Sequence, residues 1–183
     1  MSQQDSSKRR PSAGVSDIAV IAEVIATLAV ALWLGGMLAL GAFAAPEVFG
    51  QLPRETAGSV MGAIFGKFDS LVLVVAGLLL VAEAVRLVLE GTRGKLGLAR
   101  LAVAGALVVL ALLSALWLGP AINDLFEAGV RRGVGDDGAD MDRLHHLAEL
   151  LGKVAFFLAA VWITLGILLH RRAVAGGVSG DVA

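Results

Sequence analysis

The chain has 183 residues, of which 57% are hydrophobic and 17% charged, and its formal net charge at pH 7 is −1. A soluble domain of this length is rarely so apolar, whereas a compact helical membrane protein often is. Cysteine is absent, which excludes disulfides, thiol catalysis and cysteine-ligated metals. Because the chain has no net basic charge, we expect the lipid bilayer as its main partner and no nucleic acid.

Four long apolar segments follow one another along the chain. They cover about residues 18–45, 70–90, 96–119 and 148–170. About 20 helical residues cross a hydrocarbon core of about 30 Å, so each segment is long enough to span it. Because lipid satisfies no backbone polar group, each span must be helical. The sequence therefore predicts an all-α fold, an integral membrane four-helix bundle within residues 16–172, flanked by disordered tails at 1–15 and 173–183.

The first apolar segment follows three basic residues, Lys8, Arg9 and Arg10, as the core of a cleaved signal peptide also does. Its apolar part, however, is far longer than the about 7 to 15 residues of a signal-peptide core. We therefore expect this segment to be retained as the first span.

Basic residues are concentrated on one side of the four spans. Besides the N-terminal tail, they occupy the second connection (Arg93, Lys95 and Arg100) and the C-terminal end (Arg171 and Arg172). With four spans these three segments share one side, which the positive-inside rule makes cytoplasmic. The third connection carries three arginines, but four aspartates accompany them. We predict a multi-pass protein of a bacterial inner (plasma) membrane with both termini in the cytoplasm.

The second and third helices are expected to extend beyond the outer face of the membrane. About 57 Å of helix from Pro53 to Glu90 is nearly twice the hydrocarbon thickness. Pro46 is expected to end the first helix, which places the first turn between Pro46 and Pro53. Pro120 is expected to kink or restart the third helix. The acidic stretch 133–142 lacks the ligand spacing of a calcium loop and is typical of a solvated linker.

Small residues recur at every fourth position on three of the helices. The stripes are Gly58, Gly62 and Gly66; Thr27, Ala31, Gly35 and Ala39; and Ala111, Ala115 and Gly119. Such stripes let membrane helices approach closely, although a ligand close to the backbone would need the same space. We expect packing, so that Gly62→Leu would destabilise the bundle more than Leu79→Ala.

Three charged residues lie inside the spans near the expected cytoplasmic end. Glu23 belongs to the first span, whereas Glu83 and Arg86 lie three residues apart on the second and therefore share one face. An ionisable group in a membrane span is a functional candidate by default. We expect an ion-paired cluster with Arg86 in the middle, and a proton or cation relay is the alternative.

A second polar group lies near the expected outer face. His145, Glu149 and Lys153 follow at four-residue steps and share one face of the fourth helix, while Asp69 marks the outer edge of the second span. Histidine beside a carboxylate can shuttle protons or bind metal, but the neighbouring His146 points about 100° away. We expect no cofactor here and leave a metal open. Asp69 or Glu149 is predicted to pair with Lys153, with His145 one turn further out in water.

Residues 32–69, "LWLGGMLALGAFAAPEVFGQLPRETAGSVMGAIFGKFD", contain a series of separated landmarks. These are Trp33, Gly36, Pro46, Phe49, Leu52, Arg54, Ala57, Gly58, Gly62 and Phe65, followed later by Pro120 and the pair Leu144–His145. The pattern resembles the signature of a small four-span family of unknown function similar to transmembrane protein 205. The resemblance spans about residues 25–165. Ala148 and Gly152 depart from it, because the family pattern has a serine and an asparagine there.

The resemblance implies a role in transport or in ion or metal handling, without an established activity, and no enzyme activity is assigned. A structural or scaffolding subunit, bound to its own copy or to another membrane protein, is the alternative. A weaker similarity, the "W-x-G-G" start, is to four-span copper-resistance and haem-containing oxidase domains. The first three helices contain no histidine, which argues against haem unless a second copy supplies the ligand.

The predicted topology can be tested with fused reporters. Fusions after Arg172 and within residues 90–100 are expected to report a cytoplasmic location, and a fusion near Gly138 an exterior one. Alkaline phosphatase and fluorescent-protein fusions distinguish the two sides. An exterior signal from the Arg172 fusion would contradict the four-span topology.

Overall fold

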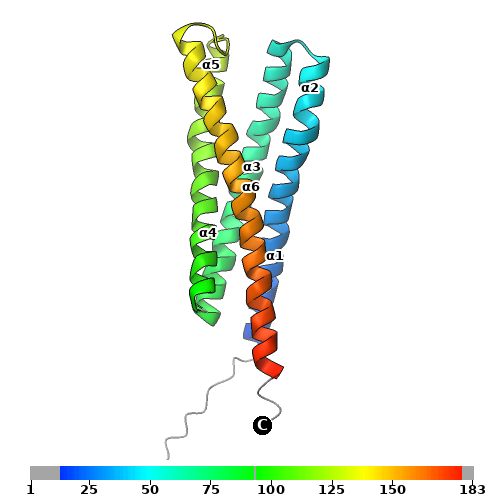
Figure 1. Ribbon diagram of the computed structural model, residues 1–183, viewed down its shortest axis with the longest axis vertical. Helices are drawn as coiled ribbons and strands as arrows, with labels where there is room; N and C mark the ends of the chain where they lie inside the picture. The colour runs from blue at the N-terminus through cyan, green and yellow to red at the C-terminus, as the bar shows by residue number, and fades with distance from the viewer. Residues whose placement is uncertain (1–12, 93, 179–183) are drawn as a thin grey trace, which may run out of the picture.

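The computed structural model describes residues 13–92 and 94–178, and it arranges them in four long helical rods (Figure 1). The rods are α1 (Ala13–Leu38), η1 (Ala39–Ala44) and α2 (Ala45–Gln51); α3 (Arg54–Glu90); α4 (Gly94–Leu113), η2 (Ser114–Leu118) and α5 (Gly119–Glu127); and α6 (Gly135–Val178). The segments η1 and η2 are π-helical turns. Each rod is long and apolar enough to cross a membrane, which confirms the predicted all-α, multi-pass four-helix bundle.

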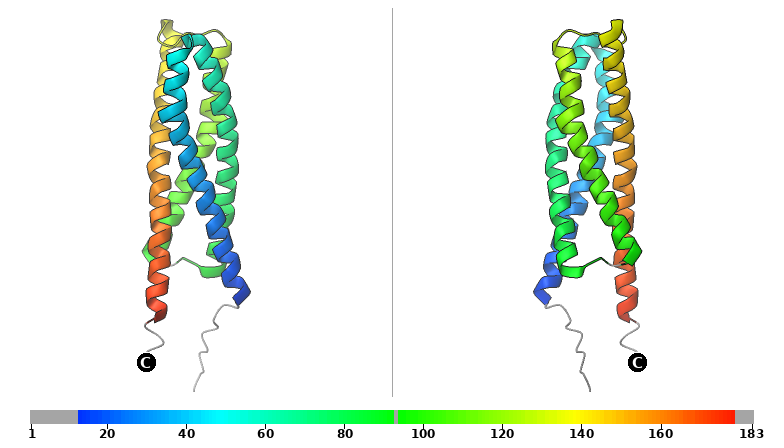
Figure 2. Two further views of the ribbon diagram at one scale, coloured as in Figure 1. Left: turned by 90° about the vertical axis from the view of Figure 1, so that its right-hand side faces the viewer. Right: turned by 90° about the vertical axis from the view of Figure 1, so that its left-hand side faces the viewer.

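The four rods run up and down in chain order. Helix α3 packs on α1 and α4, and α6 packs on α4 and closes the ring against α1. The start of α1, the end of α6 and the α3–α4 connection lie together at one end of the bundle, the terminal end (Figures 1 and 2). The connections at 52–53 and 128–134 form the opposite end, the loop end.

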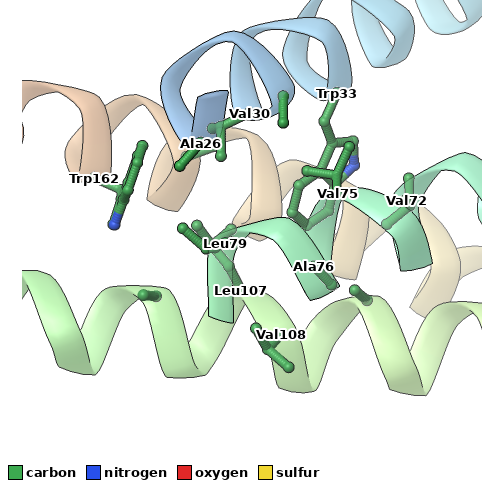
Figure 3. Close-up of a cluster of buried hydrophobic side chains, with 14 of the residues drawn as sticks. Ala26, Val30, Trp33, Val72, Val75, Ala76, Leu79, Leu107, Val108 and Trp162 are labelled. Carbon is green, nitrogen blue, oxygen red and sulfur yellow. The ribbon is translucent and has the colours of Figure 1, made fainter. Parts of the chain in front are cut away.

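Small side chains dominate the core in the middle of the bundle. Its largest fully buried members include Trp162, Leu79 and Leu107, and alanines from all four rods fill the space around them (Figure 3). Trp33 of the sequence signature is also buried here. Large apolar side chains elsewhere, such as Leu28, are exposed on the outside of the bundle. This arrangement suits a protein surrounded by lipid, where close packing rather than escape from water holds helices together.

Both prolines that were expected to interrupt helices lie directly after a π-helical turn. Pro46 follows η1 and Pro120 follows η2, and each occupies the first turn of the next α-helix. A proline inside an α-helix removes one hydrogen bond and collides with the preceding turn, and the extra residue of a π turn relieves that conflict. The first helix therefore continues through Pro46 to Gln51, and the expectation that it ends at Pro46 was wrong. It ends where Leu52, extended because it precedes Pro53, leaves the helix.

All four rods, and not only the second and third, are much longer than a bilayer core. Their apolar-helix stretches have 35, 37, 34 and 37 residues. Helix α6 begins at Gly135, so most of the acidic stretch expected as a linker is helical, with Asp136 and Asp137 stabilising the first turn.

The predicted tails are shorter than expected where the structure describes them. Residues 13–15 already belong to α1, and α6 continues over residues 173–178. The remaining parts of the predicted tails, 1–12 and 179–183, lie outside the described residues.

The glycine stripe on α3 packs only at its first member. A Cβ atom at Gly58 would lie 3.2 Å from the Phe126 ring, whereas at Gly62 or Gly66 it would meet nothing within 4 Å. The tightest approach between rods is instead at Gly36, where a Cβ would collide with the Phe68 ring. The expectation that Gly62 lies in a close seam was wrong, because that face of α3 points out of the bundle.

Substitution at these glycines tests the revised packing. Gly36→Ala is expected to destabilise the protein by about 1–3 kcal/mol, because Phe68 must move. Gly62→Ala is expected to be neutral or to stabilise by up to about 1 kcal/mol through helix propensity. Unfolding of both variants in detergent, followed by circular dichroism, checks the order; a larger loss at Gly62 would contradict the packing.

Candidate functional site

Two of the predicted charged residues, Glu83 and Arg86, form a buried ion pair on α3. Their exposed fractions are 3% and 8%. Arg86 donates from Nη2 and Nε to Glu83 Oε2, at 2.6 and 3.0 Å. The three-residue spacing on one helix face makes this geometry possible.

Arg100 of α4 joins this pair to the first rod. Its Nη2 donates to both carboxylate oxygens of Glu23 at 2.7 Å. Its Nε lies 3.1 Å from Glu83 Oε1, close enough for an ion pair but without hydrogen-bond geometry. The Arg100 side chain is 3% exposed, so protein groups rather than solvent surround its guanidinium.

Trp162 completes the group from α6. Its Nε1 donates to Glu83 Oε1 at 3.0 Å, and its ring lies 4.2 Å from the Arg100 guanidinium carbon in a cation–π contact. A Cβ at Gly166, one turn further along, would come within 3.1 Å of Glu23 and 3.2 Å of Arg100. The glycine therefore leaves the space in which the two charged groups meet.

We call Glu23, Glu83, Arg86, Arg100 and Trp162 the inner network. It takes at least one residue from each rod and contains two carboxylates and two guanidinium groups, so its formal charge is balanced. It lies about 9 Å inward from the terminal-end start of α4. At such a depth an unpaired charge is costly, and mutual pairing reduces that cost.

The predicted cluster of Glu23, Glu83 and Arg86 forms, but the prediction that Arg86 is its central residue was wrong. Arg100 bridges the rods, whereas Arg86 contacts Glu83 within its own helix. From the sequence we assign Arg100 to the basic second connection. In the structure it lies nearly two turns inside α4, which begins at Gly94. Its position after the start of the third apolar segment was the missed signal. Trp162 carried no comparable signal, because an apolar helix commonly contains a tryptophan.

The polar residues expected near the outer face do not form one cluster. Lys153 pairs with Glu149 at 2.7 Å, one of its two predicted partners, but both side chains are exposed, at 66% and 60%. The His145 ring nitrogen Nδ1 lies 2.9 Å from the Met141 carbonyl oxygen of its own helix. Asp69 lies apart from them, against Gly119.

Most of the remaining signature residues lie on the surface. Pro46, Phe49, Arg54, Phe65 and Pro120 are exposed, whereas Trp33, Gly36 and Gly58 take part in packing between rods. Within residues 13–92 and 94–178 there is no group of three or more histidine, aspartate or glutamate side chains that could hold a metal ion.

A family model for a domain of unknown function, DUF4149, matches residues 28–131. The chain belongs to this family. The match covers more than half of the chain, includes Asp69, Glu83, Arg86 and Arg100, and ends before α6. Glu23 and Trp162 of the inner network lie outside it. No curated protein and no solved structure matches the chain.

Removing Arg100 tests the importance of the inner network for stability. Arg100→Leu is expected to destabilise the protein by about 3–5 kcal/mol, because two carboxylates lose their shared partner. Lys153→Met, which removes an exposed pair, is the control and is expected to leave the unfolding midpoint unchanged. Equal effects in detergent unfolding would show that Arg100 is not a central link.

Proposed function

We propose that this protein is a small transport-associated, ion-handling protein of the bacterial inner membrane, and that its inner network binds and releases protons near the cytoplasmic side. The observation that carries the proposal is the meeting of four ionisable side chains from three rods inside apolar helices. Intramembrane charges of this kind commonly mark ion and proton pathways. The resemblance of the first two helices to the family similar to transmembrane protein 205 supports the same class of function.

Glu23 is the member of the network that a proton can reach. Its side chain is 36% exposed, whereas Glu83, Arg86 and Arg100 are buried. Protonation of Glu23 would remove one of the two negative charges and leave Glu83 to neutralise both arginines. The contact between Glu23 and Arg100 would weaken, and with it the link between α1 and α4.

This coupling gives the network two states that differ in charge and in helix contact. In the ionised state Glu23 accepts two hydrogen bonds from Arg100. In the protonated state Arg100 is held by Glu83 and the Trp162 ring alone. An equilibrium that a bound proton shifts between two helix arrangements is the minimum that proton-linked transport needs.

A structural role is the alternative, since a balanced, mostly buried network also clamps helices together. In that case the protein would act as a scaffolding subunit for a second copy or another membrane protein. A haem or metal redox function has less support, because His145 and His170 lie at opposite ends of α6, about 37 Å apart. The two main hypotheses differ in the role of the Glu23 charge: proton transport requires Glu23 to exchange a proton, whereas a structural role requires the charge only for folding.

Proton flux into proteoliposomes distinguishes the two hypotheses. With an imposed inside-negative potential and an entrapped pH-sensitive dye, the protein is expected to acidify the lumen faster than empty vesicles do. Glu23→Gln should abolish the difference, because the residue can no longer exchange a proton. Glu149→Gln, an equally conservative change at the exposed pair, should leave it unchanged.

Two results would contradict the proposal. One is a wild-type flux equal to that of empty vesicles; the other is a flux that Glu23→Gln leaves intact. The unfolding midpoint of each variant, measured before reconstitution, shows whether a variant that loses flux is still folded.

A further inference from the structure

Asp69 is a carboxylate of α3 that lies outside the inner network. It is half-buried and lies where the long apolar stretch of α3 begins, about 21 Å from Glu83 along the helix. Among the residues that the structure describes, none donates a hydrogen bond to the Asp69 carboxylate or forms an ion pair with it. A partly desolvated carboxylate without a partner is costly at membrane depth.

The backbone opposite Asp69 is the π-helical turn of the third rod. A Cβ atom at Gly119 would lie 3.0 Å from Asp69 Oδ2 and 3.2 Å from the Ser114 carbonyl oxygen. A side-chain oxygen and a backbone oxygen therefore border the same point beside Gly119. Because glycine has no Cβ, the Asp69 carboxylate can approach the backbone of this turn so closely.

The same turn leaves a carbonyl oxygen without a helical donor. The Gly119 N–H donates to Ser114 O, five residues earlier, and Pro120 has no N–H to donate. The Ala115 carbonyl oxygen therefore receives no hydrogen bond from residue 119, whose N–H goes to Ser114 O, or from residue 120, which is proline. The Asp69 carboxylate thus lies against a turn whose Ser114 carbonyl accepts one hydrogen bond and whose Ala115 carbonyl receives none from residue 119 or 120.

We propose that Asp69 and the η2 turn bind a small monovalent metal cation, with sodium as the best fit. Oxygen atoms of carboxylate and carbonyl groups are the ligands of hard cations. The region contains one carboxylate, whose single negative charge a monovalent ion neutralises; a divalent ion would leave an excess positive charge. Interrupted membrane helices supply carbonyl oxygens to ions in the same way.

This cation site is distinct from the inner network. It lies toward the loop end, in the contact between α3 and the η2 turn, and it does not depend on proton exchange at Glu23. Occupation would remove the uncompensated charge of Asp69 and tie α3 to the interrupted part of the third rod. Ion binding should therefore stabilise the folded protein and alter the surroundings of the η2 turn.

A sodium titration of the full-length protein in detergent tests the site. Trp117 lies within η2 and is half-exposed, so its fluorescence should report occupation, and Trp117→Phe identifies its share of the signal. Choline chloride keeps the ionic strength constant. We expect a saturable fluorescence change and a rise in the unfolding midpoint with sodium, since a ligand that binds only the folded state stabilises it.

Two variants and one matched control make the result specific. Asp69→Asn should abolish the sodium response, and Gly119→Ala should weaken sodium binding at least tenfold, because the added Cβ, 3.0 Å from Asp69 Oδ2, pushes the carboxylate away from the turn. Asp124→Asn, at an exposed carboxylate on the adjoining α5, should bind as the wild type does. Sodium-23 NMR line broadening on the folded wild type provides a second measure of binding that needs no variant.

The proposal is overturned by any of three results. They are the absence of saturable sodium binding to the wild type, a sodium response that persists in Asp69→Asn, and a response to calcium but not to sodium. If Asp69→Asn does not fold, Gly119→Ala decides: unchanged sodium affinity in that variant overturns the site.

Discussion

Charge neutralisation inside an apolar bundle is the constraint on which the arrangement of the rods depends. Arg100 is almost fully buried, and in lipid its charge must be matched by protein groups. Glu23 and Glu83 supply that match from two other rods, and Trp162 contacts both Arg100 and Glu83 from the fourth. Because side chains gain little by leaving lipid for the core, such directional contacts fix which helices meet and in what register.

The contacts that join the rods differ between the terminal end and the loop end. The inner network links all four rods, and the alanine-rich core continues the close packing to the middle. Beyond it, α3 still meets α5 at Gly58 and Phe126, and Glu55 pairs with Arg131 at 2.8 Å, whereas α2 makes no close backbone contact with α5 or α6 in the described part of the chain (Figure 1). Both π turns lie between the core and the loop end. The two proposed ion sites therefore lie toward opposite ends of the bundle.

The sequence was sufficient to predict the class of fold and insufficient to predict the centre of the site. Four apolar segments of membrane-spanning length can form little else, so the bundle follows from composition and length. Pro46 misled because a proline usually ends a helix, and only the structure shows the π turn that accommodates it. Arg100 misled because a basic residue near a helix end can either lie at the membrane surface, where it indicates topology, or be buried as the partner of a carboxylate. The distinction depends on where the Glu83 and Glu23 carboxylates lie in space, which periodicity alone does not contain.

A double-mutant cycle between Arg100 and Glu83 tests the central claim most directly. The free energy of unfolding would be measured in one detergent for the wild type, Arg100→Leu, Glu83→Gln and the double variant. If the two side chains neutralise each other across α3 and α4, the double variant should lose less stability than the two single variants together, with a coupling energy above about 1 kcal/mol. Effects that add to within about 0.5 kcal/mol would show that the two charges act independently and would contradict the account.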